Sequence, residues 1–284
     1  MKRKKAIPVY MVVYYIFLCL AVVIVLIPFI WMLSASFDRI NSYELPYPPR
    51  FIPANPSLFN YQLVIKNLNI IQYMFNTVIV VIISLALQLI LAPLAGFAFS
   101  KGTFPLKMLL LTLVLSNMMV PIETKILPMY QMIKGMGLSN TYLGIALPAV
   151  LTNGFFIFLM KKFCDDLPNE LLESGTLDGA SRLRIYLQIY LPLMGPGLAT
   201  LAVLDVMNVW NDLLWPMIVV NKIEMFTIQA GLAMFSSGGD AVAVSKHAGM
   251  ATAASVLSII PLALVFIFLQ KYIVQSIAVS GIKQ

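Results

Sequence analysis

The chain has 284 residues, of which 60% are hydrophobic and 11% are charged, whereas an ordinary soluble domain carries roughly 25% charged residues. So few polar side chains cannot cover a globule in water, which excludes the classes of soluble enzyme and soluble binding domain. Long apolar runs alternate with polar loops and lack the period-two pattern of a transmembrane barrel, so the predicted fold class is an all-α integral membrane protein.

Six stretches are long and apolar enough to cross a hydrocarbon core about 30 Å thick, which takes about 20 helical residues. In chain order they are residues 10–33, 76–99, 106–122, 142–160, 192–219 and 250–273. We expect Pro93 and Gly96 to break the second span and Pro121 to close the short third span. The predicted organisation is a basic N-terminus (1–9), a membrane domain (10–273) with a cytosolic loop at 163–190, and a tail (274–284).

The N-terminus begins with the basic sequence MKRKK, and an apolar run follows it. A secretory signal peptide would fit this order, with SAS at residues 34–36 as the cleavage site. The apolar run is, however, much longer than the core of about 7–15 residues that a signal peptide has. We therefore expect an uncleaved first membrane helix.

Positive charge predicts the orientation, because cytoplasmic loops are enriched in Lys and Arg. If the N-terminus is cytosolic, six spans place twelve of the nineteen Lys and Arg on the same side: Lys2, Arg3, Lys4, Lys5, Lys101, Lys107, Lys161, Lys162, Arg182, Arg184, Lys271 and Lys283. The external loops hold the other seven over longer stretches of sequence. We therefore expect both termini in the cytosol, and the net charge of +7 reflects topology and attraction to anionic lipid rather than nucleic-acid binding.

One charged stretch, ELLESGTLDGASRLRIYLQIYLPLMGP at residues 170–196, interrupts the apolar sequence. The Asp-Leu-Pro at residues 166–168 predicts a helix start, since proline suits the first helical turn. That helix is expected to end near Leu177, with a turn at Gly179 and a second helix capped by Ser181.

This short helix, turn and helix would lie on the cytosolic face between the fourth and fifth spans. Leu167, Leu171 and Leu172 are expected to press on the membrane domain while Glu173 faces outward. Two interpretations are open: a rigid projection that a partner protein grips, or an ordinary amphipathic helix at the membrane interface.

The same stretch resembles the EAA loop of ABC importer permeases, whose pattern is E-A-A, two residues, D-G-A, an aromatic residue, L-P and a further proline. The matching residues are Glu173, Asp178, Gly179, Ala180, Tyr186, Leu191, Pro192 and Pro196. Ser174 and Gly175 replace the two alanines of the pattern, and Tyr186 replaces its phenylalanine. Residues 142–148 (YLGIALP), residues 210–216 (WNDLLWP) and the tail extend the resemblance to the carbohydrate-uptake group, which includes the smaller membrane subunit of the maltose transporter.

The resemblance implies a permease subunit of a binding-protein-dependent importer in the cytoplasmic membrane of a prokaryote. Its expected partners are a larger second permease chain, two ATPase subunits, an extracytoplasmic sugar-binding protein and the lipid bilayer. The residues that it implies for docking the ATPase are Glu173, Ser174, Gly175, Asp178, Gly179 and Ala180, and those for a tail contact with the ATPases are Gly281 and Lys283.

ATP and Mg are expected on the partner subunits only, because no G-x-x-x-x-G-K-[ST] phosphate loop occurs here. No metal site is expected either, since His247 is the one histidine of the chain.

Polar side chains within the spans are candidates for a translocation pathway, because such groups are costly at bilayer depth. They are Asp205, Asn208, Trp210, Asn211, Asp212 and Asn153. Asp205, Asn208 and Asp212 are expected on one helix face from their spacing. Amides and carboxylates would bind the hydroxyl groups of a neutral solute, and the aromatic ring would cover sugar C–H surface. The competing interpretation is that these side chains join helices to one another or anchor them at the membrane interface.

Three functions remain in competition. The first is import of a sugar or oligosaccharide by alternating access. The second is an ABC permease for another solute, such as a polyamine, phosphate or an amino acid. The third is an intramembrane enzyme, which would need a convergent set such as a Ser–Lys dyad or paired aspartates. Asp205 has no evident acidic partner in the sequence, and no catalytic residue is therefore assigned.

Overall fold

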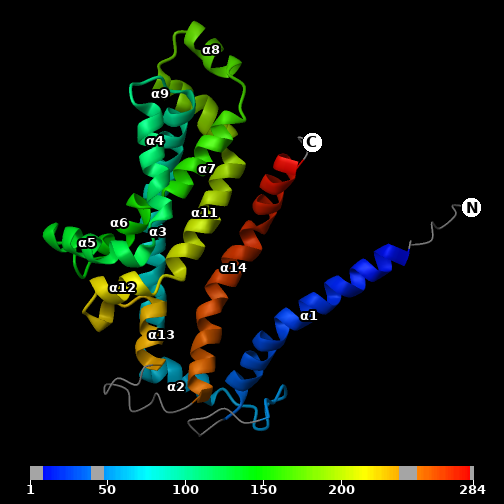
Figure 1. Cartoon of the computed structure of the whole chain (residues 1–284). Helices are drawn as coiled ribbons and strands as arrows, with labels where there is room; N and C mark the ends of the chain where they lie inside the picture. The colour runs from blue at the N-terminus through cyan, green and yellow to red at the C-terminus, as the bar shows by residue number, and fades with distance from the viewer. Residues whose placement is uncertain (1–8, 40–47, 237–247, 282–284) are drawn as a thin grey trace, which may run out of the picture. The chain divides into compact units, whose positions relative to one another are not determined.

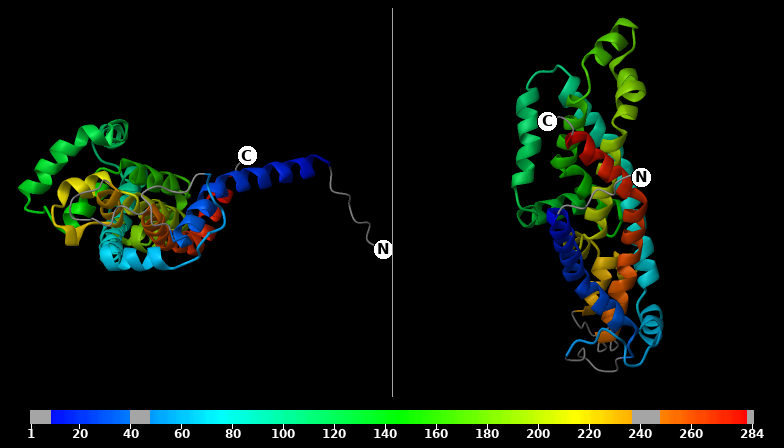
Figure 2. Two further views of the ribbon diagram at one scale, coloured as in Figure 1. Left: turned by 90° about the horizontal axis from the view of Figure 1, so that it is seen from below. Right: turned by 90° about the vertical axis from the view of Figure 1, so that its right-hand side faces the viewer.

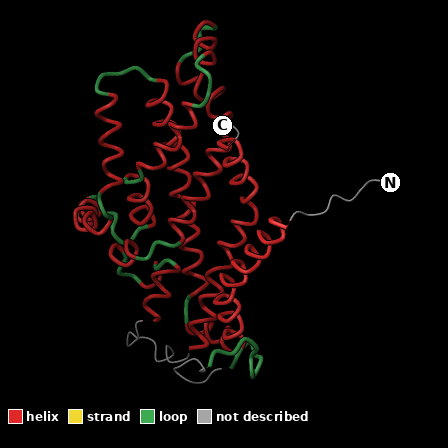
Figure 3. Tube along the Cα trace, turned by 45° about the vertical axis from the view of Figure 1, so that its right-hand side comes forward, coloured by secondary structure: helices red, strands yellow, loops and turns green. Residues whose placement is uncertain are grey.

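A computed structural model describes residues 9–39, 48–236 and 248–281 of the chain, and throughout these ranges the regular structure is helical (Figures 1 and 3). The chain divides into two compact units. The first comprises Met1–Leu68 and Met234–Ser258, and the second comprises Asn69–Ala233 and Ile259–Gln284. The basic N-terminal residues and His247 of the sequence analysis lie outside the described residues.

The first unit holds helix α1 (Val9–Phe37), helix α2 (Phe59–Asn67) and the beginning of α14 (Ala248–Gly281). The amide of Asn60 donates hydrogen bonds to the main-chain oxygens of Ser36, at 3.0 Å, and Asp38, at 2.7 Å. These bonds attach α2 to the end of α1 across a proline-rich loop. The expected first span is confirmed as a helix, and the apolar part of α1 extends it to Phe37.

The centre of the second unit is α3 (Ile70–Lys101), which contacts α6 (Tyr142–Leu151), α7 (Gly154–Asp165) and α11 (Gly195–Trp210). The prediction that Pro93 and Gly96 break this span is wrong, because α3 continues through both residues over 32 residues. Both residues are buried against neighbouring helices, and such packing compensates for the hydrogen bond that proline removes. A Cβ atom on Gly96 would lie 2.7 Å from the main-chain nitrogen of Lys161, so the glycine permits close approach of α7.

The third expected span ends as predicted but is followed by a helix that was not predicted, and the fourth is bent. Helix α4 (Lys107–Ser116) and the 3-10 turn η1 (Asn117–Met119) end before Pro121, as expected, and α5 (Ile122–Gly135) follows at 110°. The expected fourth span consists of α6 and α7, which meet at 52° and continue to Asp165. The loop predicted to begin at residue 163 therefore begins at residue 166, after the end of α7.

The expected fifth span is also discontinuous. Helix α11 ends at Trp210, and a separate helix, α12 (Leu214–Val219), follows. The prediction of one helix over residues 192–219 is therefore wrong. The 3-10 turn η3 (Ile223–Met225) and α13 (Ile228–Ser236) complete this part of the chain.

The last helix, α14, continues eight residues beyond the predicted end of the sixth span, so most of the expected tail is helical. In the described residues, three helices are long and apolar enough to cross a membrane, and there are up to six spans if each bent pair counts as one. The fold is thus that of a helical membrane protein with discontinuous spans.

Candidate functional site

The charged stretch forms a projection at one end of the second unit. It consists of α8 (Glu170–Leu177) and α9 (Arg182–Ile185), and we call residues 166–185 the α8–α9 element. Figure 1 shows α8 beyond the ends of α3 and α7, with α9 beside it, and Figure 2 shows the same projection from other directions. The expected helix, turn and second helix are confirmed, with the first helix beginning at Glu170.

The turn between the two helices depends on Gly179, whose φ is +74°. L-residues other than Asn and Asp rarely adopt this left-handed conformation. The preceding helix ends in a typical glycine C-cap, in which the main-chain nitrogen of Ala180 donates to the oxygen of Gly175 at 3.0 Å. Ser181 caps α9 as expected, since its Oγ accepts a hydrogen bond from the main-chain nitrogen of Arg184 at 3.3 Å.

The two faces of α8 differ as the sequence predicts. Leu167, Leu171 and Leu172 are partly buried against an apolar cluster beneath the element. Glu173 points outward and is exposed. The cluster includes Phe156, whose side chain is fully buried, so the inner face is firmly packed and the outer face stays open.

The six residues expected to dock an ATPase are divided between these faces. Glu173, Ser174, Asp178 and Gly179 are exposed, whereas Gly175 is buried and Ala180 is partly buried against the apolar cluster. A Cβ atom on Gly175 would lie 3.0 Å from Cγ1 of Ile185. Gly175 therefore lets α8 pack closely on α9, and the outer surface is made by the other residues.

A shallow groove of about 430 Å³ runs along this outer surface, lined by Leu172, Glu173, Thr176, Leu177 and Arg182. Leu177 is 88% exposed, at the C-terminal end of α8. The sequence pattern predicts Leu177 as a helix end but does not predict its exposure. An apolar residue placed immediately before a helix-ending Asp-Gly turn is the signal that would have identified it.

The route from the α8–α9 element to α11 is not straight. A π-helical turn, η2 (Tyr186–Tyr190), and the short α10 (Leu191–Leu193) follow α9, and the helix then bends by 76° before α11. Phe97 of α3 packs against the rings of Tyr186 and Tyr190, with centroid distances of 5.3 and 5.0 Å. The connection between this element and α11 is therefore bent and is held by aromatic packing against α3.

The expected pathway residues do not form one group. Asp205 is buried, and its Oδ1 accepts a hydrogen bond from Ser84 Oγ of α3 at 3.1 Å. Asn208 is exposed on the same helix. Asp212 lies beyond the end of α11, so the helical spacing that predicts a shared face does not apply to it.

Two of the candidates do line a common cleft. Asn211 and Asp212 border a cleft of about 300 Å³, together with residues of α5, α6 and α12: Ile122, Ile126, Met129, Pro148, Ala149, Thr152, Leu213, Leu214 and Trp215. Trp210 is buried away from this lining, and Asn153 lies at the break between α6 and α7. The indole of Trp215 donates to the main-chain oxygen of Gly144 at 3.1 Å, which fixes one wall of the cleft.

One of the two residues expected to contact the ATPases lies in the described part of the chain. Gly281 is the last residue of α14, and Lys283 lies outside the described residues.

Comparison with known proteins identifies the family. Residues 88–279 match the family model described as binding-protein-dependent transport system inner membrane component. The arabinooligosaccharides transport system permease protein AraQ of Halalkalibacterium halodurans is 33% identical over 208 residues, which cover 73% of this chain and 72% of that protein. The diacetylchitobiose uptake system permease protein NgcG of Streptomyces coelicolor is 28% identical over 90% of this chain and 83% of its own length.

A third relative is named for a different solute. The sn-glycerol-3-phosphate transport system permease protein UgpE of Rhizobium meliloti is 29% identical over 95% of this chain and 96% of its own length. Among solved structures, a chain in the crystal structure of a bacterial ABC transporter involved in the import of the acidic polysaccharide alginate matches with a TM-score of 0.79. That match has 22% identity and covers 93% of this chain and 96% of the other, so it supports the fold.

Proposed function

The chain belongs to the binding-protein-dependent transport system inner membrane components, and on this basis we propose that it is the permease subunit of an ABC importer for a sugar or an oligosaccharide. The observation that carries the proposal is the α8–α9 element: a rigid helix, glycine turn and helix whose outer face is open at the end of a membrane bundle. An ATPase subunit would bind this outer face of the α8–α9 element.

In this proposal the chain crosses the cytoplasmic membrane six times, with both termini and the α8–α9 element in the cytosol. Its partners are a second, larger permease chain, two ATPase subunits and an extracytoplasmic binding protein. ATP and Mg are bound by the ATPase subunits, and this chain performs no chemical step. Discontinuous spans such as α6–α7 and α10–α11 fit a transport role, because broken helices in membranes line cavities rather than lipid.

The mechanism is alternating access. A loaded binding protein docks on the external face, ATP closes the two ATPase subunits, and their movement displaces the α8–α9 element. Glu173, Ser174, Asp178 and Gly179 form the docking contact, while Gly175 and Ala180 hold the element in shape from within. The cleft lined by Asn211 and Asp212 offers amide and carboxylate acceptors to a hydroxyl-rich solute. Gly281 and Lys283 are assigned to a tail contact with the ATPases.

A second solute class follows from a specific observation. The relative named for sn-glycerol-3-phosphate covers almost the whole of this chain, so a phosphorylated polyol is the alternative to a neutral sugar. Both substrates present hydroxyl groups, and the difference is the phosphate charge. Uptake of arabino-oligosaccharides, diacetylchitobiose and sn-glycerol-3-phosphate therefore discriminates between the two classes, and a polyamine serves as a negative control.

The docking surface is tested by Gly179→Asp in whole cells. Aspartate tolerates the left-handed backbone conformation, and no atom lies within 4 Å of the added Cβ, so the chain folds but presents a side chain where a partner backbone would approach. A matched control is Gly137→Asp, since Gly137 has a φ of +72° and equally open space. The measurements are the chain level in the membrane, the ATPase subunit retained there, and uptake of labelled solutes.

We expect Gly179→Asp to lose most of the ATPase and all uptake at a normal chain level, and Gly137→Asp to behave as the wild type. If both variants retain the ATPase and import solute normally, the α8–α9 element is an interfacial helix and the proposal loses its support.

A further inference from the structure

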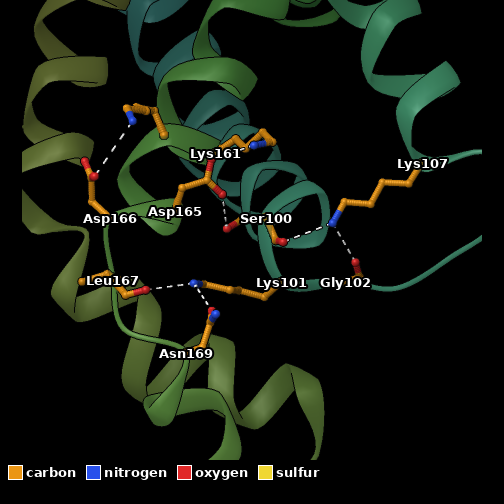
Figure 4. Close-up of polar contacts among 10 residues, drawn as sticks. Ser100, Lys101, Gly102, Lys107, Lys161, Asp165, Asp166, Leu167 and Asn169 are labelled. Carbon is orange, nitrogen blue, oxygen red and sulfur yellow. Dashed lines mark hydrogen bonds and ion pairs between the residues drawn. The ribbon is translucent and has the colours of Figure 1, made fainter.

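The C-terminal end of α3 is attached to the α8–α9 element by a lysine. Nζ of Lys101 donates to the main-chain oxygen of Leu167 at 2.8 Å and to Oδ1 of Asn169 at 2.7 Å, as Figure 4 shows. Charge-assisted bonds of this kind are stronger than neutral ones. The preceding residue adds a third bond, from Ser100 Oγ to Oδ1 of Asp165 at 2.7 Å. Residues 166–169 lead from α7 into α8, and we call them the stem that leads into α8. This stem is therefore held by the last turn of α3.

Asn169 occupies the N-cap position of α8 but does not cap that helix. Asparagine is among the preferred N-cap residues, because its side-chain oxygen accepts a hydrogen bond from the first turn. Here the same oxygen faces Lys101. The Asn169 side chain therefore joins α8 to α3 instead of capping the first turn of α8.

The segment that follows the Gly179 turn, which contains Arg182 of α9 and Tyr190 of η2, contacts the same turn of α3. Nη1 of Arg182 donates to the main-chain oxygen of Lys101 at 3.2 Å. The ammonium of Lys101 also lies 5.8 Å from the ring centroid of Tyr190, which in turn packs on Phe97. The Lys101 side chain is therefore hydrogen-bonded only to the stem that leads into α8, whereas Arg182 bonds to the Lys101 main chain and Tyr190 of η2 offers only a ring contact.

These contacts matter because the covalent route to the membrane helices is bent. The chain leaves α9 through a π-helical turn and a 76° bend before α11 begins. Bent segments transmit a displacement less directly than a continuous helix, whereas α3 is one helix of 32 residues that contacts α6, α7 and α11.

We propose that Lys101 is a positioning residue that clamps the stem leading into α8 to α3, so that a displacement of the α8–α9 element moves α3 as well as α11. The proposal rests on the proposed function, since it assigns to α3 a share of the coupling between ATP hydrolysis and transport. Lys101 touches neither ATP nor solute and acts through Leu167 and Asn169.

The test uses the complete transporter in proteoliposomes, with Lys101→Met, Lys101→Arg and Lys107→Met. Lys107 is a matched control, because its Nζ donates to the main-chain oxygens of Ser100 and Gly102, at 3.1 and 2.9 Å, near the same helix end but not to the α8–α9 element. ATPase subunits retained, ATP hydrolysed and solute imported are measured together. Solute imported per ATP hydrolysed is a readout that a general loss of folding does not change.

We expect Lys101→Met to retain the ATPase subunits but to import about tenfold less solute per ATP, because the variant loses both hydrogen bonds from the ammonium to Leu167 and Asn169. Lys107→Met should match the wild type, and Lys101→Arg should recover most of the ratio because it keeps a cationic donor. Asn169→Ala should lower the ratio in the same direction but by less, because the bond from Lys101 to the main-chain oxygen of Leu167 remains, and adding it to Lys101→Met should cause no further loss. A wild-type ratio in both Lys101→Met and Asn169→Ala overturns the proposal.

A distance measurement on the isolated permease separates failure of this proposal from failure of the proposed function. Spin labels at Thr103→Cys and Leu177→Cys, both exposed positions, are placed in a chain with Cys19 and Cys164 replaced. Lys101→Met should broaden the distance distribution and Lys107→Met should not. This result does not depend on import, so an unchanged distribution in Lys101→Met contradicts the clamp even if no solute in the panel is transported.

Discussion

At the scale of single residues, two glycines in one short segment serve different purposes. Gly179 supplies a left-handed backbone conformation at an exposed turn. Gly175 is buried and lets α8 lie close to α9, because any side chain at this position would contact Ile185. The two positions should therefore respond differently to the same kind of substitution.

For Gly175→Ala we expect a free energy of unfolding within about 1 kcal/mol of the wild type. Alanine gains about 1 kcal/mol of helix propensity over glycine, and the added Cβ needs only a small movement of the flexible Ile185 side chain. Gly175→Leu should cost about 1–3 kcal/mol, because a large side chain overpacks the contact between α8 and α9. Thermal unfolding of the purified permease measures both, and equal midpoints for Ala and Leu would show that the contact is not tight.

At the scale of elements, several polar side chains in the membrane helices join one helix to another segment. Asn76 of α3 donates to the main-chain oxygens of Glu224, at 2.7 Å, and Phe226, at 3.0 Å, and accepts a hydrogen bond from Tyr142 at 2.9 Å. Asp205 of α11 is bonded to Ser84 of α3. Both side chains therefore join one helix to another segment, as the second of the two interpretations of intramembrane polar groups describes.

Asn76→Ala should lower the free energy of unfolding by about 1–3 kcal/mol, because the main-chain oxygens of Glu224 and Phe226 and the hydroxyl of Tyr142 lose hydrogen bonds to the buried amide. The control is Asn67→Ala, since Asn67 is exposed and its amide bonds only to Leu63 of the same helix, and we expect a change below about 0.5 kcal/mol. Thermal unfolding in detergent compares the two. A control variant as damaged as Asn76→Ala would mean that amide loss in general, and not this junction, is responsible.

At the scale of the whole molecule, the number of membrane crossings depends on how the bent pairs are counted. Three continuous helices and three bent pairs give six spans if every pair crosses the membrane once. Six crossings with a cytosolic N-terminus place the α3–α4 connection and the α8–α9 element on one side and the end of α5 on the other.

Single cysteines test this arrangement in a chain that lacks Cys19 and Cys164. Thr103→Cys and Leu177→Cys should resist a membrane-impermeant maleimide in right-side-out vesicles and react after the vesicles are opened. Met136→Cys, at the exposed end of α5, should react in both conditions. Labelling of Leu177→Cys from outside would contradict the six-span orientation and the cytosolic position of the α8–α9 element.

Much of the α8–α9 element was predictable, because caps and turns depend on local chemistry. The end of α8 at Leu177, the Gly179 turn and the Ser181 cap are all signalled by residues within a few positions. The contacts of Lys101 were not predictable, because they join its side chain to a main-chain oxygen and an amide oxygen 66 and 68 positions away in the sequence.

The sequence alone determined the membrane class, most of the helical segments and the family resemblance, because composition and short-range motifs report on burial and local backbone conformation. Only the tertiary structure decided that α3 runs unbroken through Pro93, that α11 stops at Trp210, and that Asp205 bonds to Ser84. The physical reason is that these outcomes depend on packing between helices that are distant in the chain. Such packing can override a residue's intrinsic preference, or give a polar side chain a partner that lies far away in the sequence.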